Sequence, residues 1–285
     1  MGLFGVRLLA LGVVLFTPGV GTIRIGAFNI KSFGRRKMGD PAVAQIIIQI
    51  VSRYDVILIQ EIRDITNTSV NELHGNLSAH VRAANPSARF TYKISPRLGR
   101  TRYKEQYAFF YRSDRVNVVA SHLFTESGGD VFEREPFCIL LSIPGRAGPW
   151  SLALIGLHTK PTHAADELHY LFNQVESEVK LTWNTQNLLY LGDMNADCRY
   201  LPVSHQMVTG VFQHPGYLSL IGSDADTTTG RSNCAYDRIV ATGSDVISAV
   251  QSARVYPYDL ELGLDPTLTN RVSDHYPVEV ELGAP

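Results

Sequence analysis

The alternation of hydrophobic and polar positions along this chain changes period repeatedly, which predicts a protein of mixed strands and helices. A strand is expected at Ile23–Ile30, where the pattern roughly alternates, followed by a basic loop at Lys31–Lys37. Asp40 and Pro41 then have the residue types that cap and open a helix. From Val43 onward, apolar residues recur at the i, i+3, i+4, i+7 and i+8 spacing of a helix with one buried face.

The rest of the chain continues in this way, with many short strands and two further helices. Val56–Gln60 is a short apolar run, as expected of a strand covered on both faces. Helices are expected at Ser69–Ala84 and at Ala164–Trp183. The other strand-like runs are Phe90–Ile94, Tyr107–Tyr111, Val116–Leu123, Phe137–Ile143, Ser151–Leu157, Leu188–Leu191, Asp237–Ala241, Val246–Val255 and Val278–Leu282. Strands and helices alternate without a linker-like stretch, which predicts one α+β or α/β domain with two sheets. The periodicity does not give the order of the strands in those sheets.

Composition and charge are ordinary for a globular protein and narrow the possible partners. The 285 residues are 45% hydrophobic, so the chain can bury a sizeable core. The 26 basic and 27 acidic residues give a net charge of −1, which excludes a basic coat that holds polyanions by charge alone. A nucleic-acid partner would therefore need a local positive stripe or a bound metal.

The N-terminus has the layout of a secretory signal peptide. Arg7 precedes the apolar run Leu8–Phe16, and Pro18 and Gly19 follow it. A membrane anchor is the alternative, but the apolar run has about half the roughly 20 residues that a spanning helix needs. We therefore expect a signal peptide at residues 1–21, a single domain at residues 22–285, secretion to the extracellular space and no membrane anchor.

Three cysteines are too few for a disulfide scaffold, but an oxidising compartment changes what they predict. Outside the cytosol, Cys198 and Cys234 are expected to form a disulfide, two free thiols being the alternative. Cys138 lies inside the apolar segment FCILLSI and is expected to be buried and unpaired. Asn67 and Asn76 begin N-glycosylation sequons.

Polar residues that can do chemistry follow several of the apolar runs directly. They are Asn29, Glu61, His158, Asp193, Asn195, Asp274 and His275. Strand ends hold side chains rigidly at the edge of a sheet, so the repetition favours one converging site over unrelated surface or capping residues.

The residue types at these positions indicate a particular chemistry. Carboxylate and amide oxygens suit Mg²⁺, Mn²⁺ or Ca²⁺ rather than zinc. His158 and His275 can serve as acid and base near neutral pH if carboxylates orient them, and Glu105 and Asp237 are candidate partners. An oxygen-bound divalent metal with two histidine–carboxylate pairs is what hydrolysis of a phosphodiester needs.

Several ordered motifs resemble those of the endonuclease/exonuclease/phosphatase superfamily. They are IQEIRD (59–64), LHTKP (157–161), GDMNADC (192–198), NCAYDRIV (233–240) and SDHYPVEV (273–280). The segments LGRTRYKEQY (98–107), REPF (134–137) and CAYDR narrow the resemblance to secreted deoxyribonuclease I and its like proteins. The likeness runs from Ile23 to Leu282.

The resemblance implies a four-layer α/β sandwich, in which two packed mixed β-sheets are flanked by helices. It implies a divalent-metal-dependent endonuclease that hydrolyses double-stranded DNA with little sequence specificity and leaves 5′-phosphate and 3′-hydroxyl ends. The residues placed around the catalytic Mg²⁺ or Mn²⁺ and the phosphate are Asn29, Glu61, Asp193, Asn195 and Asp274. His275 paired with Asp237 would deprotonate water, and His158 paired with Glu105 would protonate the leaving oxygen.

DNA contacts are also implied by the resemblance. Arg63, Tyr103 and Arg134 match positions that contact DNA across the minor groove. Lys31 stands where the family usually has Arg, which keeps the charge but loses a bidentate fork. Contacts of this kind give little base specificity.

Structural calcium ions are the last feature that the resemblance implies. One loop contains Asp226 and Thr228, and the other contains Asp130, Phe132 and Glu135. Turn chemistry alone could account for both loops, because Asp, Thr and Gly are common turn residues.

The resemblance also implies that the protein is a monomer. Inhibition by actin is not expected, because Pro96 stands where the actin-binding strand of the family has an acidic residue.

Two other classes of function stay open at this stage. A phosphodiesterase of the same superfamily could act on a lipid or inositol phosphate, such as a sphingomyelinase, but the CAYDR, KEQY and REPF segments argue against it. A relative that only holds DNA or actin would be non-catalytic, and the presence of both histidines with their carboxylates argues against that.

Overall fold

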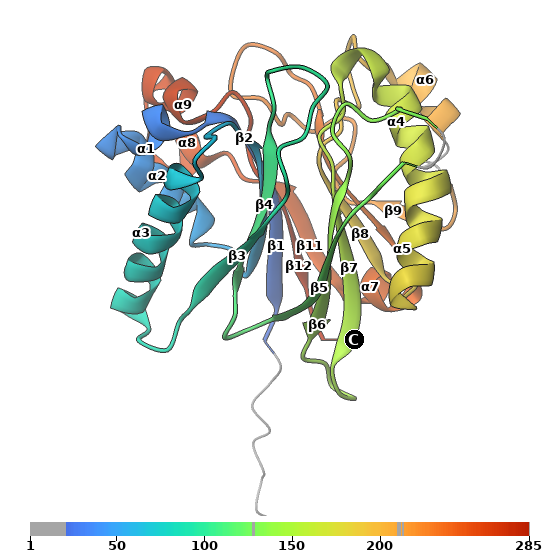
Figure 1. Cartoon of the computed structure of the whole chain (residues 1–285), viewed down its shortest axis with the longest axis horizontal. Coiled ribbons are helices and arrows are strands. Elements are labelled where there is room, and N and C mark those ends of the chain that lie inside the picture. The colour runs from blue at the N-terminus through green and yellow to red at the C-terminus, as the bar shows by residue number, and fades with distance from the viewer. Residues whose placement is uncertain (1–20, 127–128, 210–211, 213, 285) are drawn as a thin grey trace, which may run out of the picture.

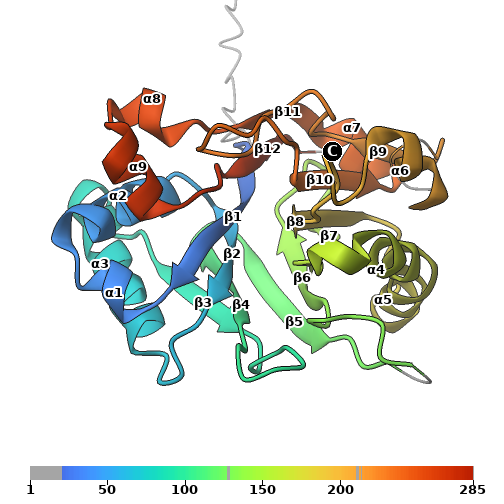
Figure 2. The same cartoon turned by 90° about the horizontal axis from the view of Figure 1, so that it is seen from above.

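Two six-stranded sheets pack face to face, and helices cover the outer face of each (Figures 1 and 2). The computed structural model describes residues 21–126, 129–209, 212 and 214–284. The four-layer α/β sandwich expected from the sequence is therefore confirmed. The expected signal peptide lies outside the described residues, apart from Gly21.

The first sheet has the strand order β11-β12-β1-β2-β4-β3. In chain order these strands are β1 (Ile23–Phe33), β2 (Val56–Ile62), β3 (Phe90–Ile94), β4 (Gln106–Arg112), β11 (Val250–Val255) and β12 (Val278–Leu282). Only β1 and β2 run parallel, and the other neighbours are antiparallel. The helices on this side are α1 (Arg35–Met38), α2 (Pro41–Val51), α3 (Thr68–Ala84), α8 (Tyr258–Leu262) and α9 (Pro266–Val272).

The second sheet has the order β5-β6-β7-β8-β10-β9, with β7 and β8 parallel. Its strands are β5 (Asn117–Leu123), β6 (Phe137–Ile143), β7 (Trp150–Gly156), β8 (Leu188–Asp193), β9 (Tyr217–Ser219) and β10 (Asp237–Thr242). The helical segments are a 3₁₀ turn (Pro161–His163), α4 (Ala164–Tyr170), a π-helical stretch (Leu171–Val175), α5 (Glu176–Trp183), α6 (Val203–Thr209) and α7 (Ser244–Ala249). No helix in the described part of the chain is long and apolar enough to cross a bilayer.

The hydrophobic core has three layers, one in each gap of the sandwich. Between the sheets, Leu58 and Phe109 of the first sheet and Ile139 of the second are fully buried. Outside the first sheet, α2 contributes the face that begins at Val43, as its periodicity predicts. Outside the second sheet, the helical residues of 164–183, including Leu168, pack on β7 and β8. Strands covered on both faces, such as β2, explain the uninterrupted apolar runs.

Two sequence-based predictions of secondary structure were wrong in part. The expected basic loop at 31–37 is the end of β1 followed by the short helix α1. The expected strand Val246–Val255 is split, because residues 244–249 form α7 and only 250–255 form β11. Val246 and Ala249 lie three residues apart and are both buried, so tertiary packing overrides the strand preference of the β-branched residues here. The short helices α1, α6, α8 and α9 and the strand β9 were not expected.

Candidate active site

The carboxyl ends of β1, β2, β7 and β8 meet at one edge of the sandwich, the upper edge in Figure 1. Asn29 lies in β1, Glu61 in β2 and Asp193 at the end of β8, while His158 follows β7 by two residues. Asp237 begins β10 and pairs in register with Asp193. Polar residues from distant parts of the sequence therefore face one another at a single edge, as their positions after apolar runs predict.

Two histidine–carboxylate pairs form the centre of this edge. His275 Nδ1 lies 2.7 Å from Asp237 Oδ2, and His158 Nδ1 lies 3.1 Å from Glu105 Oε2. The other ring nitrogens point toward a shared group, since Nε2 of His158 and Nε2 of His275 lie 3.4 and 3.7 Å from Asp193 Oδ2. Each ring is thus oriented by one carboxylate and has its second nitrogen at the common centre.

Three hydrogen bonds, with Asn29, Asn195 and Gln60, hold Asp193 in place. Asn29 Nδ2 donates to Asp193 Oδ2 at 3.0 Å, and the backbone N–H of Asn195 donates to Oδ1 at 3.0 Å. The backbone N–H of Asp193 donates to Gln60 Oε1 at 3.1 Å. Gln60 also donates from Nε2 to the carbonyl of Leu157 at 2.7 Å, which joins the ends of β2, β7 and β8. These bonds fix the carboxylate between the two rings.

Burial and charge oppose each other in these pairs, and charge prevails at His275 and at Glu105. Burial alone would lower the pKa of His275, but Asp237 and Asp193 outweigh it and raise the pKa to about 10. Burial would raise the pKa of Glu105, but the hydrogen bond and charge of His158, with the nearby arginines, lower the pKa to about 2. His275 is therefore protonated and Glu105 ionised at neutral pH, whereas burial raises the pKa of Asp237 above its ordinary value.

Several oxygen atoms at this edge have the properties of cation ligands. Oδ1 of Asn29, of Asp237 and of Asp274 is buried and receives no hydrogen bond from the described residues. Buried oxygen acceptors without a donor are costly unless a cation or water satisfies them. The candidate ligand atoms of Glu61, Glu105 and His158 lie within 4.8 Å of one another, as do those of Asp193, Asp237 and His275. A hard divalent cation fits this set of donors.

The backbone adopts an unusual conformation where β1 and β2 end and just after β8. Ser32, Glu61 and Asn195 have positive φ angles of 51°, 58° and 46°. At Glu61 the pairing of β2 shifts register with both neighbouring strands. The bulge turns Glu61 so that its Oε2 accepts the backbone N–H of Ser32 at 2.9 Å. Left-handed backbone at a residue other than Gly costs energy, and such strain is concentrated at functional sites.

Of the four residues expected to contact DNA, three are accessible. Lys31 and Tyr103 are exposed, and Lys31 Nζ pairs with Asp274 at 2.5 Å. Arg63 is also exposed and pairs with Glu105 at 2.8 Å. Arg134 differs, because its side chain is only 11% exposed and donates to the carbonyls of His158 and Thr159. In this structure Arg134 supports the segment after β7 that carries His158.

A fully buried carboxyl group lies behind Arg134. Glu167 of α4 accepts the backbone N–H groups of Lys160 and Glu133 at 3.1 and 3.2 Å, and its second oxygen has no donor among the described residues. Burial raises the pKa of Glu167 to about 7. Glu167 thus connects the segment after His158 to the segment that contains Arg134.

Cys198 and Cys234 form a disulfide, so the alternative of two free thiols was wrong. Cys138 is free and buried, as expected. Asp226 lies inside the loop that the bridge closes, where its Oδ1 accepts the N–H and the hydroxyl of Thr228. Thr228 forms an isolated β-bridge with His275, so this expected calcium loop contacts the candidate site directly.

The other expected calcium loop lies between β5 and β6. Asp130 pairs with Arg100 at 3.1 Å. Phe132 is buried and packs edge-on against Phe124, which leaves its backbone as the only possible ligand. Glu135 is partly exposed, and residues 127–128 of the same loop lie outside the described residues.

Sequence reasoning missed the polar residues that support the site. Gln60 is described above, and Tyr107 accepts the backbone N–H of His158 at 2.8 Å. Ser273 Oγ donates to the carbonyl of Asn29 and accepts the N–H groups of Lys31 and His275. A glutamine inside an apolar strand was the available signal, since a buried amide needs partners.

Comparison with known proteins agrees with this geometry. The model of the Endonuclease/Exonuclease/phosphatase family matches residues 26–275. The chain is 40% identical to human Deoxyribonuclease-1-like 2, over 96% of this chain and 97% of that protein. It is 37% identical to dog (Canis lupus familiaris) Deoxyribonuclease-1, over 96% of each chain.

Solved structures support the fold independently. The crystal structure of the endonuclease/exonuclease/phosphatase from Bacteroides vulgatus is similar with a TM-score of 0.62 at 15% identity, covering 93% of this chain and 100% of that chain. At this identity the similarity shows the fold alone. From the family model and the sequence identities together, the chain belongs to the endonuclease/exonuclease/phosphatase family and, within it, to the group of Deoxyribonuclease-1 and its like proteins.

Proposed function

We propose that this protein is a secreted, divalent-metal-dependent endonuclease that hydrolyses phosphodiester bonds of double-stranded DNA. The observation that carries the proposal is the convergence of two histidine–carboxylate pairs on Asp193, with both free Nε2 atoms within 3.7 Å of one oxygen. Hydrolysis of a phosphodiester needs one group to accept a proton from water and another to donate one to the leaving oxygen. The names of the relatives, which are deoxyribonucleases, support DNA as the substrate.

The two pairs divide the proton transfers. His275, oriented by Asp237, accepts the proton of the attacking water at Nε2. His158, oriented by Glu105, donates a proton from Nε2 to the leaving O3′, which leaves a 5′-phosphate and a 3′-hydroxyl end. The pKa of His275 must fall from about 10 before the ring can act as a base, and neutralising the charge of Asp193 and Asp274 has that effect.

A divalent metal, Mg²⁺ or Mn²⁺, fits the unpaired oxygens at the same edge. Asn29, Glu61, Asp193, Asn195 and Asp274 are the residues that would hold the metal and the scissile phosphate. When bound, the metal supplies positive charge that stabilises the negative charge that develops on the phosphate. Asn195 donates its side-chain amide to the carbonyl of Thr159 at 3.1 Å, which leaves its Oδ1 as the atom for this role.

DNA contacts surround this edge. Lys31, Arg63 and Tyr103 would contact the sugar-phosphate backbone, which explains low sequence specificity because such contacts carry no base information. Arg134 would act on DNA only through the loop that it supports, since its guanidinium is already bonded to two carbonyls.

The remaining features of the proposal concern the compartment and structural ions. A cleaved signal peptide at residues 1–21 fits the disulfide, because such bonds persist outside the cytosol. Ca²⁺ would bind the loop of Asp226 and Thr228 and the loop of Asp130, Phe132 and Glu135. Asn76 is exposed on α3, whereas Asn67 precedes this helix with a positive φ of 56° and a buried Oδ1. We expect a monomer that actin does not inhibit.

Plasmid DNA and sphingomyelin, each incubated with purified protein with and without EDTA, test the proposal. We expect nicking of the plasmid that EDTA abolishes, and no release of phosphocholine from sphingomyelin. Hydrolysis of sphingomyelin without nicking would instead identify a lipid phosphodiesterase. Plasmid binding without cleavage at any divalent metal would identify a non-catalytic relative.

A further inference from the structure

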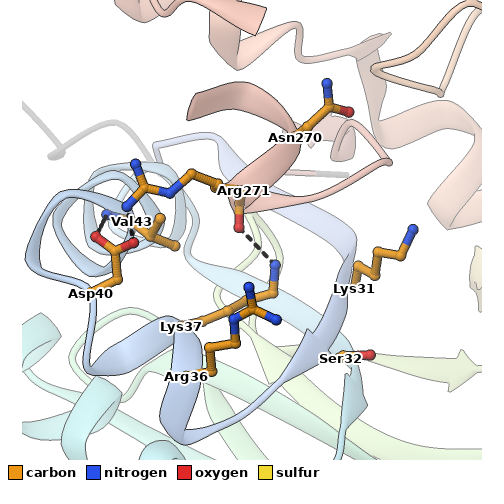
Figure 3. A pocket seen from close by; sticks show the side chains of 8 residues that line it. All are labelled: Lys31, Ser32, Arg36, Lys37, Asp40, Val43, Asn270 and Arg271. Atoms are coloured by element: carbon orange, nitrogen blue, oxygen red, sulfur yellow. Dashed lines mark hydrogen bonds and ion pairs between the residues drawn. The ribbon is translucent and has the colours of Figure 1, made fainter. Parts of the chain in front are cut away.

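A basic pocket of about 350 Å³ lies beside the candidate site (Figure 3). It is lined by Lys31, Ser32, Arg36, Lys37, Asp40, Val43, Asn270 and Arg271. These residues come from the end of β1, from α1, from the start of α2 and from α9, so the pocket joins the segment 31–43 to residues 270–271. Its volume falls within the range of small-ligand pockets, roughly 300–1,000 Å³.

The charges in this pocket are not balanced. Arg271 pairs with Asp40, the only acidic residue that lines it. Lys31 pairs with Asp274, which belongs to the candidate site. Arg36 is exposed and has no hydrogen bond or ion pair with any described residue. One guanidinium in the pocket is therefore free to bind an anion.

Lys37 adds a second positive charge at the inner wall. Its Nζ donates to the carbonyls of Arg271 and Val272 at 2.9 and 2.6 Å, which positions the ammonium group between α1 and α9. Burial lowers the pKa of Lys37 to about 8, and the charges of Lys31 and Arg36 contribute to the lowering. The ammonium group is still mainly charged at pH 7, and an anion in the pocket would relieve the repulsion among these cations.

We propose that this pocket binds a second phosphate of the DNA strand, adjacent to the phosphate that is cut, with Arg36 as its principal ligand. The inference rests on the proposed function and specifies how that site holds its substrate. Lys31 links the two places, because it lines the pocket and also pairs with Asp274 at the candidate site. A phosphodiester fits better than a carboxylate or a base, since a guanidinium pairs with two phosphate oxygens at once and the lining has no exposed aromatic ring for stacking.

Salt-dependent binding of a short duplex tests the proposal without turnover. Affinity is measured between roughly 50 and 200 mM salt, the range over which phosphate contacts change affinity strongly, in a His158→Ala background that suppresses cleavage. Arg36→Ser should weaken binding about fivefold and reduce the slope of log affinity against log salt by about 1, the value for one lost phosphate contact. Arg36→Lys should recover most of the affinity. Unchanged affinity and slope in Arg36→Ser would overturn the proposal.

Arg146→Ser is the matched control, because it removes the same charge from a residue that is also exposed and unpaired among the described residues. Arg146 lies in the turn between β6 and β7, at the end of β7 opposite to His158. It should leave both affinity and slope as in the parent protein. An equal loss in Arg146→Ser would show that net charge, not the pocket, is responsible, and would also overturn the proposal.

Kinetics separate the pocket from the catalytic groups. In the otherwise native protein, Arg36→Ser should raise KM for duplex DNA more than it lowers kcat. The loss on duplex should exceed the loss on bis(4-nitrophenyl) phosphate, a diester with no neighbouring phosphate. Equal losses on both substrates would mean that Arg36 acts through the fold, which contradicts the proposal.

The two proposals fail in different ways. If the native protein cuts no DNA but the salt slope still depends on Arg36, the proposed function fails and the phosphate pocket stands. If DNA is cut and the slope is independent of Arg36, only the pocket fails. Titration with inorganic phosphate covers the other source of this anion: tight binding that Arg36→Ser abolishes, with no effect of that variant on duplex, would identify a site for free phosphate and overturn the proposal.

Discussion

Removing the Cys198–Cys234 disulfide should destabilise the protein and disturb the start of β10 at the same time. The bridge links the turn after β8 to the segment before Asp237. The carbonyl of Cys234 accepts the N–H and the hydroxyl of Thr227, each at 3.1 Å. Thr227 Oγ1 in turn accepts the N–H of Asp237 at 3.1 Å. Loss of the bridge is therefore transmitted to the carboxylate that orients His275.

The magnitude follows from the length of the closed loop. The two cysteines are separated by 36 positions, and closing a loop of about that length removes enough entropy from the unfolded chain to stabilise the fold by about 4 kcal/mol. A domain of this size loses about 2–4 °C in Tm for each kcal/mol, so the expected decrease in Tm is about 8–16 °C. The hydrogen bond from Ala235 N–H to Asp197 at 2.8 Å should hold part of the turn in place and keep the variant folded at room temperature.

Calorimetry of Cys198→Ser/Cys234→Ser, together with plasmid nicking at 25 °C, measures both consequences. Cys138→Ala is the matched control, because it removes a sulfur that is buried and unpaired. Cys138→Ala should decrease Tm by less than the double variant does, and it should leave plasmid nicking unchanged. A decrease in Tm of less than about 2 °C for the double variant would refute the loop argument, and full activity with reduced stability would refute the connection to Asp237.

Three further predictions concern the site. Glu61→Ala should reduce plasmid nicking by more than about 100-fold, beyond the usual effect of residues that merely support a metal ligand, while circular dichroism stays native; near-native nicking would remove Glu61 from the site. His158→Ala and His275→Ala should each cost about 10²- to 10⁴-fold in kcat, and the double variant should cost much less than the product, whereas multiplicative losses would indicate independent roles. Glu167 has a pKa raised to about 7 in the fold, so its contribution to stability is complete below about pH 4.5 and is lost as pH rises through 7. Urea unfolding at pH 5 and pH 8 should therefore show a smaller loss of stability for Glu167→Gln than for the native protein, and an equal loss would contradict the assigned burial.

The sequence predicted those parts of the fold in which local pattern and tertiary environment agree. Asp40 caps α2 with its carboxylate on the N–H of Val43, and the apolar face of that helix is buried as its spacing predicts. β2 was predicted because both of its faces are buried. Residues 244–249 form a helix although Val and Ile favour strands, because burial of Val246 against the core is a property of the whole fold that local preference does not contain.

The residues of the candidate site also divide into those that the sequence could predict and those that it could not. Residues at the ends of apolar runs could be found from the sequence, because a strand end determines where a side chain lies. The partners of Gln60 and Tyr107 could not be found in this way, since Leu157 and His158 lie 97 and 51 positions away. Arg134 illustrates the converse: its residue type fits a phosphate contact, but the structure buries it against the carbonyls that follow β7.

The positive φ angles at Glu61 and Asn195 imply that stability and the proposed activity favour different residues at these two positions. Left-handed backbone costs a residue such as Glu about 1–2 kcal/mol and costs Asn less, and Gly would avoid this cost. Selection for heat resistance alone should therefore favour Gly at both positions, and each such change would delete a side-chain oxygen that is proposed to hold the metal or the scissile phosphate. Laboratory evolution of a more robust variant would have to select for DNA cleavage in every round, or it would convert this fold into a stable protein without its chemistry.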